Sequence, residues 1–135
     1  MNKYQSDYLN LEELLMSYAI GYIKNFGEVL TEHIGSEELT DQGENLPEKE
    51  VFARDTSWIK KADVVIAEVS SPSLGVGYEI CLAETLKKRI LCLYKKQEGK
   101  KLSTMLVGNP NLKIVHYSDL EEANAAIKDF LTKHF

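Results

Sequence analysis

The alternation of apolar and polar positions along the chain predicts helices and strands in turn. Apolar residues recur at helical spacing in four segments, at about 10–26, 47–62, 77–88 and 118–131. Short β-branched or apolar runs, typical of buried strands, occupy 29–31, 64–69, 89–94 and 112–117. Strands that alternate with helices in this way predict an α/β protein with a parallel sheet covered by helices on both faces.

Composition narrows the class of protein. A chain of 135 residues is the usual size of one domain, so we expect residues 1–135 to form a single domain. A net charge of −5 argues against a nucleic-acid-binding surface, and no apolar run approaches the roughly 20 residues of a membrane helix. Two cysteines are too few for a disulfide framework, so we expect reduced, partly buried thiols. These features predict a cytoplasmic protein, or a nuclear one in a eukaryotic cell, without nucleic-acid or membrane partners.

The loop after the strand at 64–69 is rich in serine and glycine. It leads into a helix predicted to begin near Gly77, which would place Glu79 in the first helical turn, at the sheet edge where α/β proteins bind ligands. Ser70, Ser71 and Ser73, together with backbone N–H groups, could hold a phosphate, and Gly75 lets a ligand approach the backbone. Alternatively, Glu79 only complements the helix dipole.

Asp55 lies on the apolar stripe of the helix at 47–62, where an ionised group is costly unless it is paired or used. One interpretation is a structural aspartate that pairs with Arg54, Ser57 or a neighbouring loop. The other is a carboxyl group held near Glu79, whose raised pKa would suit a proton donor. The basic loop at 95–101 is either simply solvated or draws an anionic substrate toward Ser103.

Five motifs in the chain belong together. They are Thr31-Glu-His33, Arg54-Asp-x-x-Trp58, Ala62-Asp-Val-Val-x-Ala-Glu-Val69, Pro72-Ser-Leu-Gly-Val-Gly-Tyr-Glu79 and Arg89-Ile-Leu-Cys-Leu93. With these motifs the chain resembles a known group of enzymes, the 2′-deoxynucleoside 5′-phosphate N-hydrolases, which are close relatives of the nucleoside 2-deoxyribosyltransferases. The resemblance runs from about Phe26 to the C-terminus and implies a flavodoxin-like, doubly wound parallel sheet of four to five strands.

The resemblance also implies a reaction. Glu79 would be the nucleophile on the anomeric carbon of a 2′-deoxynucleoside 5′-monophosphate, and Asp55 would position the sugar or protonate the departing base. The products would be free base and 2-deoxyribose 5-phosphate, by chemistry like that of a retaining glycosidase. A homodimer is implied, with no metal and no organic cofactor. The implied substrate- and phosphate-binding residues are Ser73, Gly75, His33 and Ser103, the last reaching the phosphate in the neighbouring subunit.

The N-terminus departs from the family pattern. Members open with a strand and a Gly-Ser-Ile-Arg-Gly-Gly type of loop, whereas residues 1–10 contain no glycine and no apolar run. We therefore expect an atypical N-terminus that lacks the usual first strand, with weaker phosphate binding and lower activity. Two alternatives to the hydrolase remain open: a nucleoside 2-deoxyribosyltransferase, and a catalytically impaired relative that only binds nucleotides.

Overall fold

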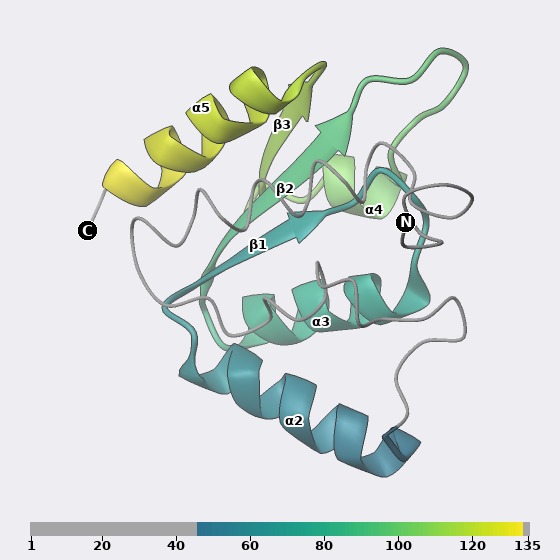
Figure 1. Cartoon of the computed structure of the whole chain (residues 1–135), viewed down its shortest axis with the longest axis vertical. Coiled ribbons are helices and arrows are strands. Elements are labelled where there is room, and N and C mark those ends of the chain that lie inside the picture. The colour runs from purple at the N-terminus through teal and green to yellow at the C-terminus, as the bar shows by residue number, and fades with distance from the viewer. Residues whose placement is uncertain (1–45, 134–135) are drawn as a thin grey trace, which may run out of the picture.

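The computed structural model describes residues 46–133. The predicted helix at 10–26, the strand at 29–31, His33 and the atypical segment 1–10 lie outside the described residues. Element labels follow Figure 1 and begin at α2. The described elements are α2 (Glu48–Lys61), β1 (Val64–Glu68), α3 (Leu74–Thr85), β2 (Arg89–Lys95), α4 (Thr104–Val107), β3 (Lys113–Tyr117) and α5 (Leu120–Thr132).

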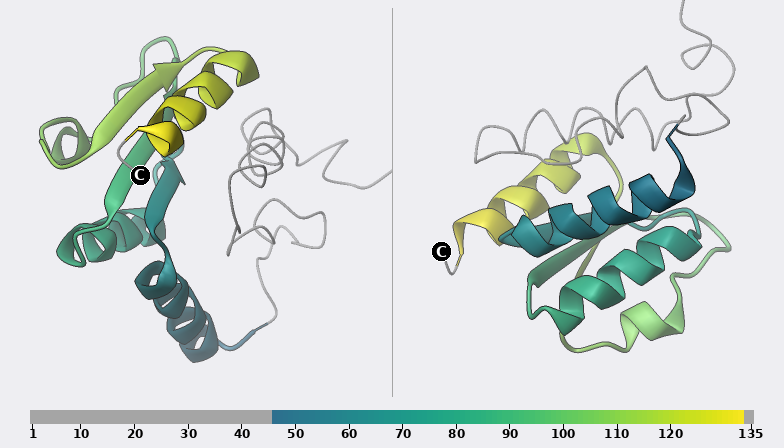
Figure 2. Two further views of the ribbon diagram at one scale, coloured as in Figure 1. Left: turned by 90° about the vertical axis from the view of Figure 1, so that its left-hand side faces the viewer. Right: turned by 90° about the horizontal axis from the view of Figure 1, so that it is seen from below.

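The three described strands form a parallel sheet in the order β1-β2-β3. Because side chains alternate between the two faces of a strand, the apolar run of β2 supplies buried side chains to both faces of the sheet. Ile90, Cys92 and Tyr94 pack on the side of α3, and Leu91 and Leu93 pack on the side of α5. The predicted parallel sheet with helices on both faces is confirmed (Figures 1 and 2).

Two apolar cores hold the layers together, one on each face of the sheet. The core on the first face joins α2, α3 and the sheet, and its buried residues are Ile59, Val69, Ile80, Ala83, Ile90, Cys92, Tyr94 and Leu112. The core on the second face joins α5 and the sheet, and its buried residues are Leu91, Leu93, Tyr117, Ala123, Ile127 and Phe130.

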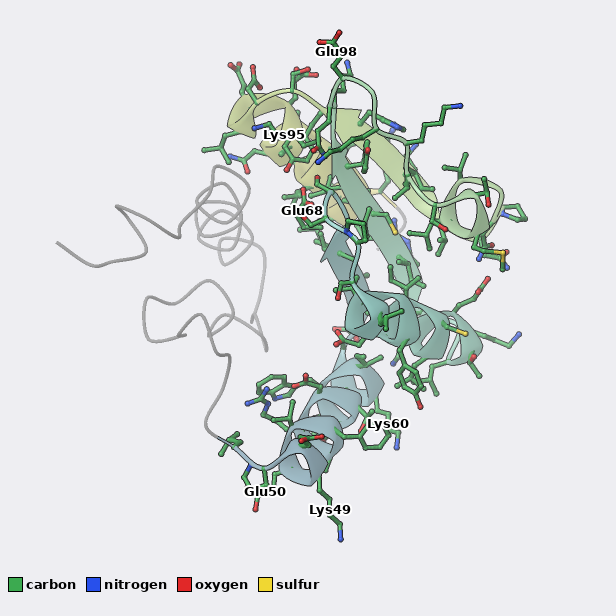
Figure 3. All side chains as sticks on the ribbon, turned by 90° about the vertical axis from the view of Figure 1, so that its right-hand side faces the viewer. Lys49, Glu50, Lys60, Glu68, Lys95 and Glu98 are labelled. Carbon is green, nitrogen blue, oxygen red and sulfur yellow. The ribbon has the colours of Figure 1, made fainter. Side chains whose placement is uncertain are left out.

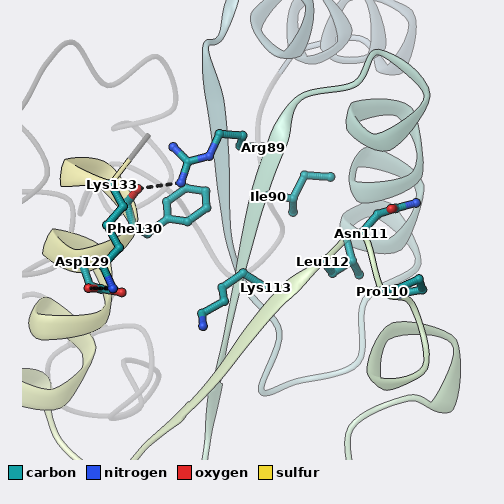
Figure 4. Close-up of a pocket in the computed structure, with 9 residues that line it drawn as sticks. All are labelled: Arg89, Ile90, Pro110, Asn111, Leu112, Lys113, Asp129, Phe130 and Lys133. Atoms are coloured by element: carbon teal, nitrogen blue, oxygen red, sulfur yellow. Dashed lines mark hydrogen bonds and ion pairs between the residues drawn. The ribbon is translucent and has the colours of Figure 1, made fainter. Parts of the chain in front are cut away.

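The amino end of β2 is fixed to α5 by Arg89. Its guanidinium donates a hydrogen bond of 2.9 Å to the Phe130 carbonyl oxygen and lies 4.3 Å from the centre of the Phe130 ring (Figure 4). Beside it, Lys133 pairs with Asp129 at 2.7 Å. The Arg89 hydrogen bond satisfies a carbonyl near the C-terminus of α5. Arg89 begins β2, so this contact lies at the end of the sheet opposite the carboxyl ends of the strands.

Several element boundaries differ from the sequence-based prediction. Helix α3 begins at Leu74 rather than near Gly77, because Ser73 caps it: the Ser73 side-chain oxygen accepts a hydrogen bond from the Val76 N–H at 3.2 Å. The prediction that Glu79 lies in the first helical turn was therefore wrong, since it is the sixth residue of a helix that begins at Leu74.

Two smaller predictions were also wrong. The helix predicted at about 47–62 has Pro47 as its N-cap rather than in its first turn. Cys81 is exposed on α3, so only Cys92 is a packing thiol, and burial raises the Cys92 pKa to about 11. The four-residue helix α4 was not predicted, because one turn is too short to show a helical period.

Candidate active site

The loop between β1 and α3 is held in place by hydrogen bonds from distant parts of the chain. Glu68 lies at the carboxyl end of β1 (Figure 3). It accepts hydrogen bonds from the Ser70 N–H at 2.6 Å and from the Tyr117 hydroxyl. Ser70 is buried, and its side-chain oxygen accepts from the Lys95 N–H at 2.7 Å. The end of each of the three strands therefore contributes to fixing the serine loop.

The N-terminus of α3 has the chemistry of an anion site. The Val76 and Gly77 N–H groups are bound to the side chain and carbonyl of Ser73. The Leu74 and Gly75 amides have no carbonyl one turn earlier in the helix, so their N–H groups are the ones that a ligand can use.

The two glycines of this helix are not demanded by its packing. A Cβ added at Gly75 would lie 3.9 Å from the Ser73 side-chain oxygen, which is an ordinary contact. One added at Gly77 would meet no described atom within 4 Å.

A cleft of about 530 Å³ opens between α3 and α4. Ser73 and Ser103 both line it, with Lys101 beside them. Ser103 is the N-cap of α4, where its side-chain oxygen accepts from the Met105 N–H at 3.2 Å. The serine loop before α3 and the Lys101–Ser103 segment before α4, which are about 30 residues apart in sequence, thus share a single cleft within one protomer.

The two predicted catalytic carboxylates lie on neighbouring helices that contact each other, Asp55 on α2 and Glu79 on α3. Burial, and secondarily the negative charge of Asp55, raises the pKa of the half-buried Glu79 above its usual value. The same helix contact brings together the rings of Phe52 and Tyr78, whose centres lie 6.2 Å apart in an edge-to-face arrangement. The charge of Asp55 thus acts on Glu79 across this helix contact, whereas their shared role in catalysis stays a prediction.

Asp55 is also paired within its own helix. The Arg54 guanidinium contacts Oδ1 of Asp55 through Nε at 2.9 Å and through Nη2 at 2.8 Å. It also lies 4.5 Å from the centre of the Trp58 ring. The structural interpretation of Asp55 named Arg54 as one partner, and that contact is observed alongside the proximity to Glu79.

The site residues thus fall into two groups on either side of α3. Asp55 and Glu79 lie toward α2, whereas Ser73 and Ser103 line the cleft toward α4. Sequence reasoning missed the Glu68–Tyr117 contact, since nothing local in the sequence links a strand-end acid to a tyrosine on another strand. For the basic loop at 95–101, sequence reasoning left open whether it is simply solvated or draws an anion toward Ser103, and the structure places its Lys101 in the same cleft as Ser103.

The doubly wound sheet, with paired acids and a serine-capped helix near the carboxyl ends of its strands, defines a class of α/β proteins that bind small ligands at that edge. The sequence profile of the nucleoside 2-deoxyribosyltransferases matches residues 5–127, and the chain belongs to this family.

Two relatives and one solved structure illustrate the similarity. A 5-hydroxymethyl-dUMP N-hydrolase from Tetraodon nigroviridis is 39% identical over 117 residues, which cover 84% of this chain and 82% of the relative. The human 5-hydroxymethyl-dUMP N-hydrolase is 37% identical over 126 residues, covering 92% of this chain and 71% of the relative. A CMP N-glycosidase from Clostridium botulinum shares the fold, with a TM-score of 0.53 and 24% identity over 59% of this chain and 73% of that chain.

Residues 46–133 lack two features that would have pointed to other functions. No helix in this part of the chain has the length and apolar character needed to cross a membrane. Over the same residues, no three histidine, cysteine, aspartate or glutamate side chains gather in a group that could hold a metal ion.

Proposed function

We propose that the protein hydrolyses the N-glycosidic bond of 2′-deoxynucleoside 5′-monophosphates. The observation that carries the proposal is the half-buried Glu79 carboxyl beside Asp55, on the helix whose N-terminus is capped by Ser73. A carboxyl group with a perturbed pKa near a ligand-binding edge is typical of an active site. The relatives named as 5-hydroxymethyl-dUMP N-hydrolases supply the class of substrate.

The reaction proceeds in two displacements. The Glu79 carboxylate attacks C1′ of the deoxyribose, and the C1′–N bond breaks with its electron pair leaving on the base, which takes up a proton. Water then attacks C1′, the ester bond to Glu79 breaks, and 2-deoxyribose 5-phosphate is released with the carboxylate regenerated. Asp55 contacts the sugar or the departing base, and the amides of Leu74 and Gly75 with the Ser73 hydroxyl bind the 5′-phosphate.

The experiment that tests the proposal incubates the protein with each common deoxynucleoside monophosphate and with 5-hydroxymethyl-dUMP, and measures released base by chromatography. Wild type should release base, and Glu79→Gln should not. Supplying a second free base separates the transferase alternative, because a transferase would form a new nucleotide. No released base, with thermal stabilisation by the nucleotide, would instead favour the impaired, binding-only relative.

A homodimer completes the proposed site. Leu74 and Met105 are 97% and 81% exposed, and both line the cleft that holds Ser73 and Ser103. Large apolar side chains exposed at the border of a polar cleft are typical of a surface that a partner covers. Met105→Lys should therefore shift the protein from dimer to monomer in light scattering, whereas Met105→Leu should not. A wild-type protein that is monomeric at micromolar concentration would contradict the dimer.

A further inference from the structure

The pairing of Arg54 with Asp55 is unusual for neighbouring residues of a helix. Successive side chains point about 100° apart around the helix axis, so they do not face each other. Arg54 nevertheless reaches back to Oδ1 of Asp55 with two nitrogens, at 2.9 and 2.8 Å. Trp58, one turn later, lies under the guanidinium at 4.5 Å and fixes this conformation by a cation–π contact.

Both partners of this pair are shielded from solvent. Their side chains are 23% and 24% exposed, which makes the pair stronger than an ordinary surface ion pair. Both guanidinium contacts converge on Oδ1. Among the described residues, no hydrogen bond uses Oδ2, so this oxygen is the one that can meet a substrate.

We propose that Arg54 is a positioning residue for Asp55 in the reaction: stacked on Trp58, it binds one carboxylate oxygen and presents the other to the nucleotide. This inference rests on the proposed function, because it assigns Asp55 a contact with substrate. Arg54 itself touches neither the sugar nor the base. Its effect on the reaction passes through Asp55.

The same contact shapes the electrostatics of the site. The positive charge of Arg54 partly offsets the negative charge that Asp55 directs at Glu79. On α3, the charged group that feels Asp55 is Glu79, whereas Glu84 is bound by the side chains of Asn109 and Asn111. Removing the guanidinium should therefore move the titration of Glu79 to higher pH.

The test is a double-mutant cycle with a matched control. Arg54→Gln keeps a planar amide without the charge, Asp55→Asn removes the partner carboxylate, and the double variant closes the cycle. Lys49→Gln removes one positive charge from an exposed position on the same helix (Figure 3). Each variant is assayed for kcat/KM of base release and for melting temperature, and the Glu79 carboxyl is titrated by NMR in wild type, Arg54→Gln and Lys49→Gln.

We expect Arg54→Gln to lower kcat/KM roughly ten- to a hundredfold, the scale of a small misplacement of an active-site group. The same change in the Asp55→Asn background should cost less than about twofold, because the two residues act as one unit. Lys49→Gln should stay within about twofold of wild type in kcat/KM. Equal losses in both backgrounds, or a lower melting temperature with unchanged kcat/KM, would overturn the proposal.

The NMR titration separates this inference from the proposed function. If wild type releases no base but Arg54→Gln raises the titration midpoint of Glu79 and Lys49→Gln does not, the electrostatic coupling is supported while the proposed reaction has failed. If wild type releases base and the Glu79 midpoint is the same in all three proteins, the reaction stands and the role of Arg54 is overturned.

Discussion

Replacing Glu79 by glutamine should abolish turnover and at the same time stabilise the fold at neutral pH. The side chain is half-buried, and its pKa is raised first by burial and then by the charge of Asp55. The folded protein therefore favours the protonated carboxyl, which glutamine imitates in size and polarity. The ionised carboxylate that the proposed reaction requires therefore destabilises the folded protein, and the substitution removes this destabilisation.

The size of the effect follows from proton linkage. Between the ordinary glutamate pKa of 4.5 and the raised value, the unfolded chain has released its proton while the folded chain still holds it. Over that window Glu79 lowers the free energy of unfolding by up to about 1.4 kcal/mol per pH unit as the pH rises. Its favourable contribution is complete below pH 4.5 and is lost as the pH passes through the raised pKa. Removing a covalent nucleophile should cost a factor of about 10⁴ or more in kcat.

Urea denaturation of wild type and Glu79→Gln, at a series of pH values from about 4 to 8, measures this difference directly. The stability advantage of the variant should grow through the window and then remain constant. Glu84→Gln is the matched control on the same helix, because hydrogen bonds from Asn111 and Asn109 lower the pKa of Glu84. That variant should lose stability above pH 4.5 relative to wild type. A Glu79→Gln protein less stable than wild type at neutral pH, or one with turnover within a few-fold of wild type, would refute the reasoning.

Three further changes test other parts of the site. Asp55→Asn should lower the rate and move the acid limb of the pH–rate profile to lower pH, because one cause of the raised Glu79 pKa is removed; a limb that stays in place would contradict this coupling. Gly75→Ala should stabilise the helix by about 0.5–1 kcal/mol, since the packing leaves room for a Cβ. The same Cβ should hinder the approach of a phosphate to the Gly75 backbone and so raise the Kd for 2-deoxyribose 5-phosphate, measured by calorimetry. Tyr117→Phe should lower the unfolding free energy by about 1.5–3 kcal/mol in chemical denaturation, because the Glu68 carboxylate loses a hydrogen bond.

The parts of the fold that could be predicted from sequence are those governed by periodicity. The apolar run of β2 has five consecutive buried residues, so a strand covered on both faces could be predicted there from the sequence. Helix α5 follows an acidic cap, Asp119, and buries three residues at helical spacing. The sequence predicted this helix at about 118–131, with a start that lies slightly too early. The cap is Asp119, whose side chain accepts from the Glu122 N–H at 2.9 Å.

The position of Glu79 could not be predicted in the same way, and the error changes the chemistry assigned to it. Two glycines at 75 and 77 weaken the helical pattern, so periodicity placed the helix start too late. The helix dipole acts most strongly within the first turn of a helix. With Ser73 as the cap, Glu79 lies beyond that turn. The dipole would have stabilised the carboxylate and lowered its pKa. Packing between α2 and α3, with Asp55 opposite, raises the pKa instead. The N-terminal amides of α3 are then left for an anion, which in the proposed reaction is the 5′-phosphate.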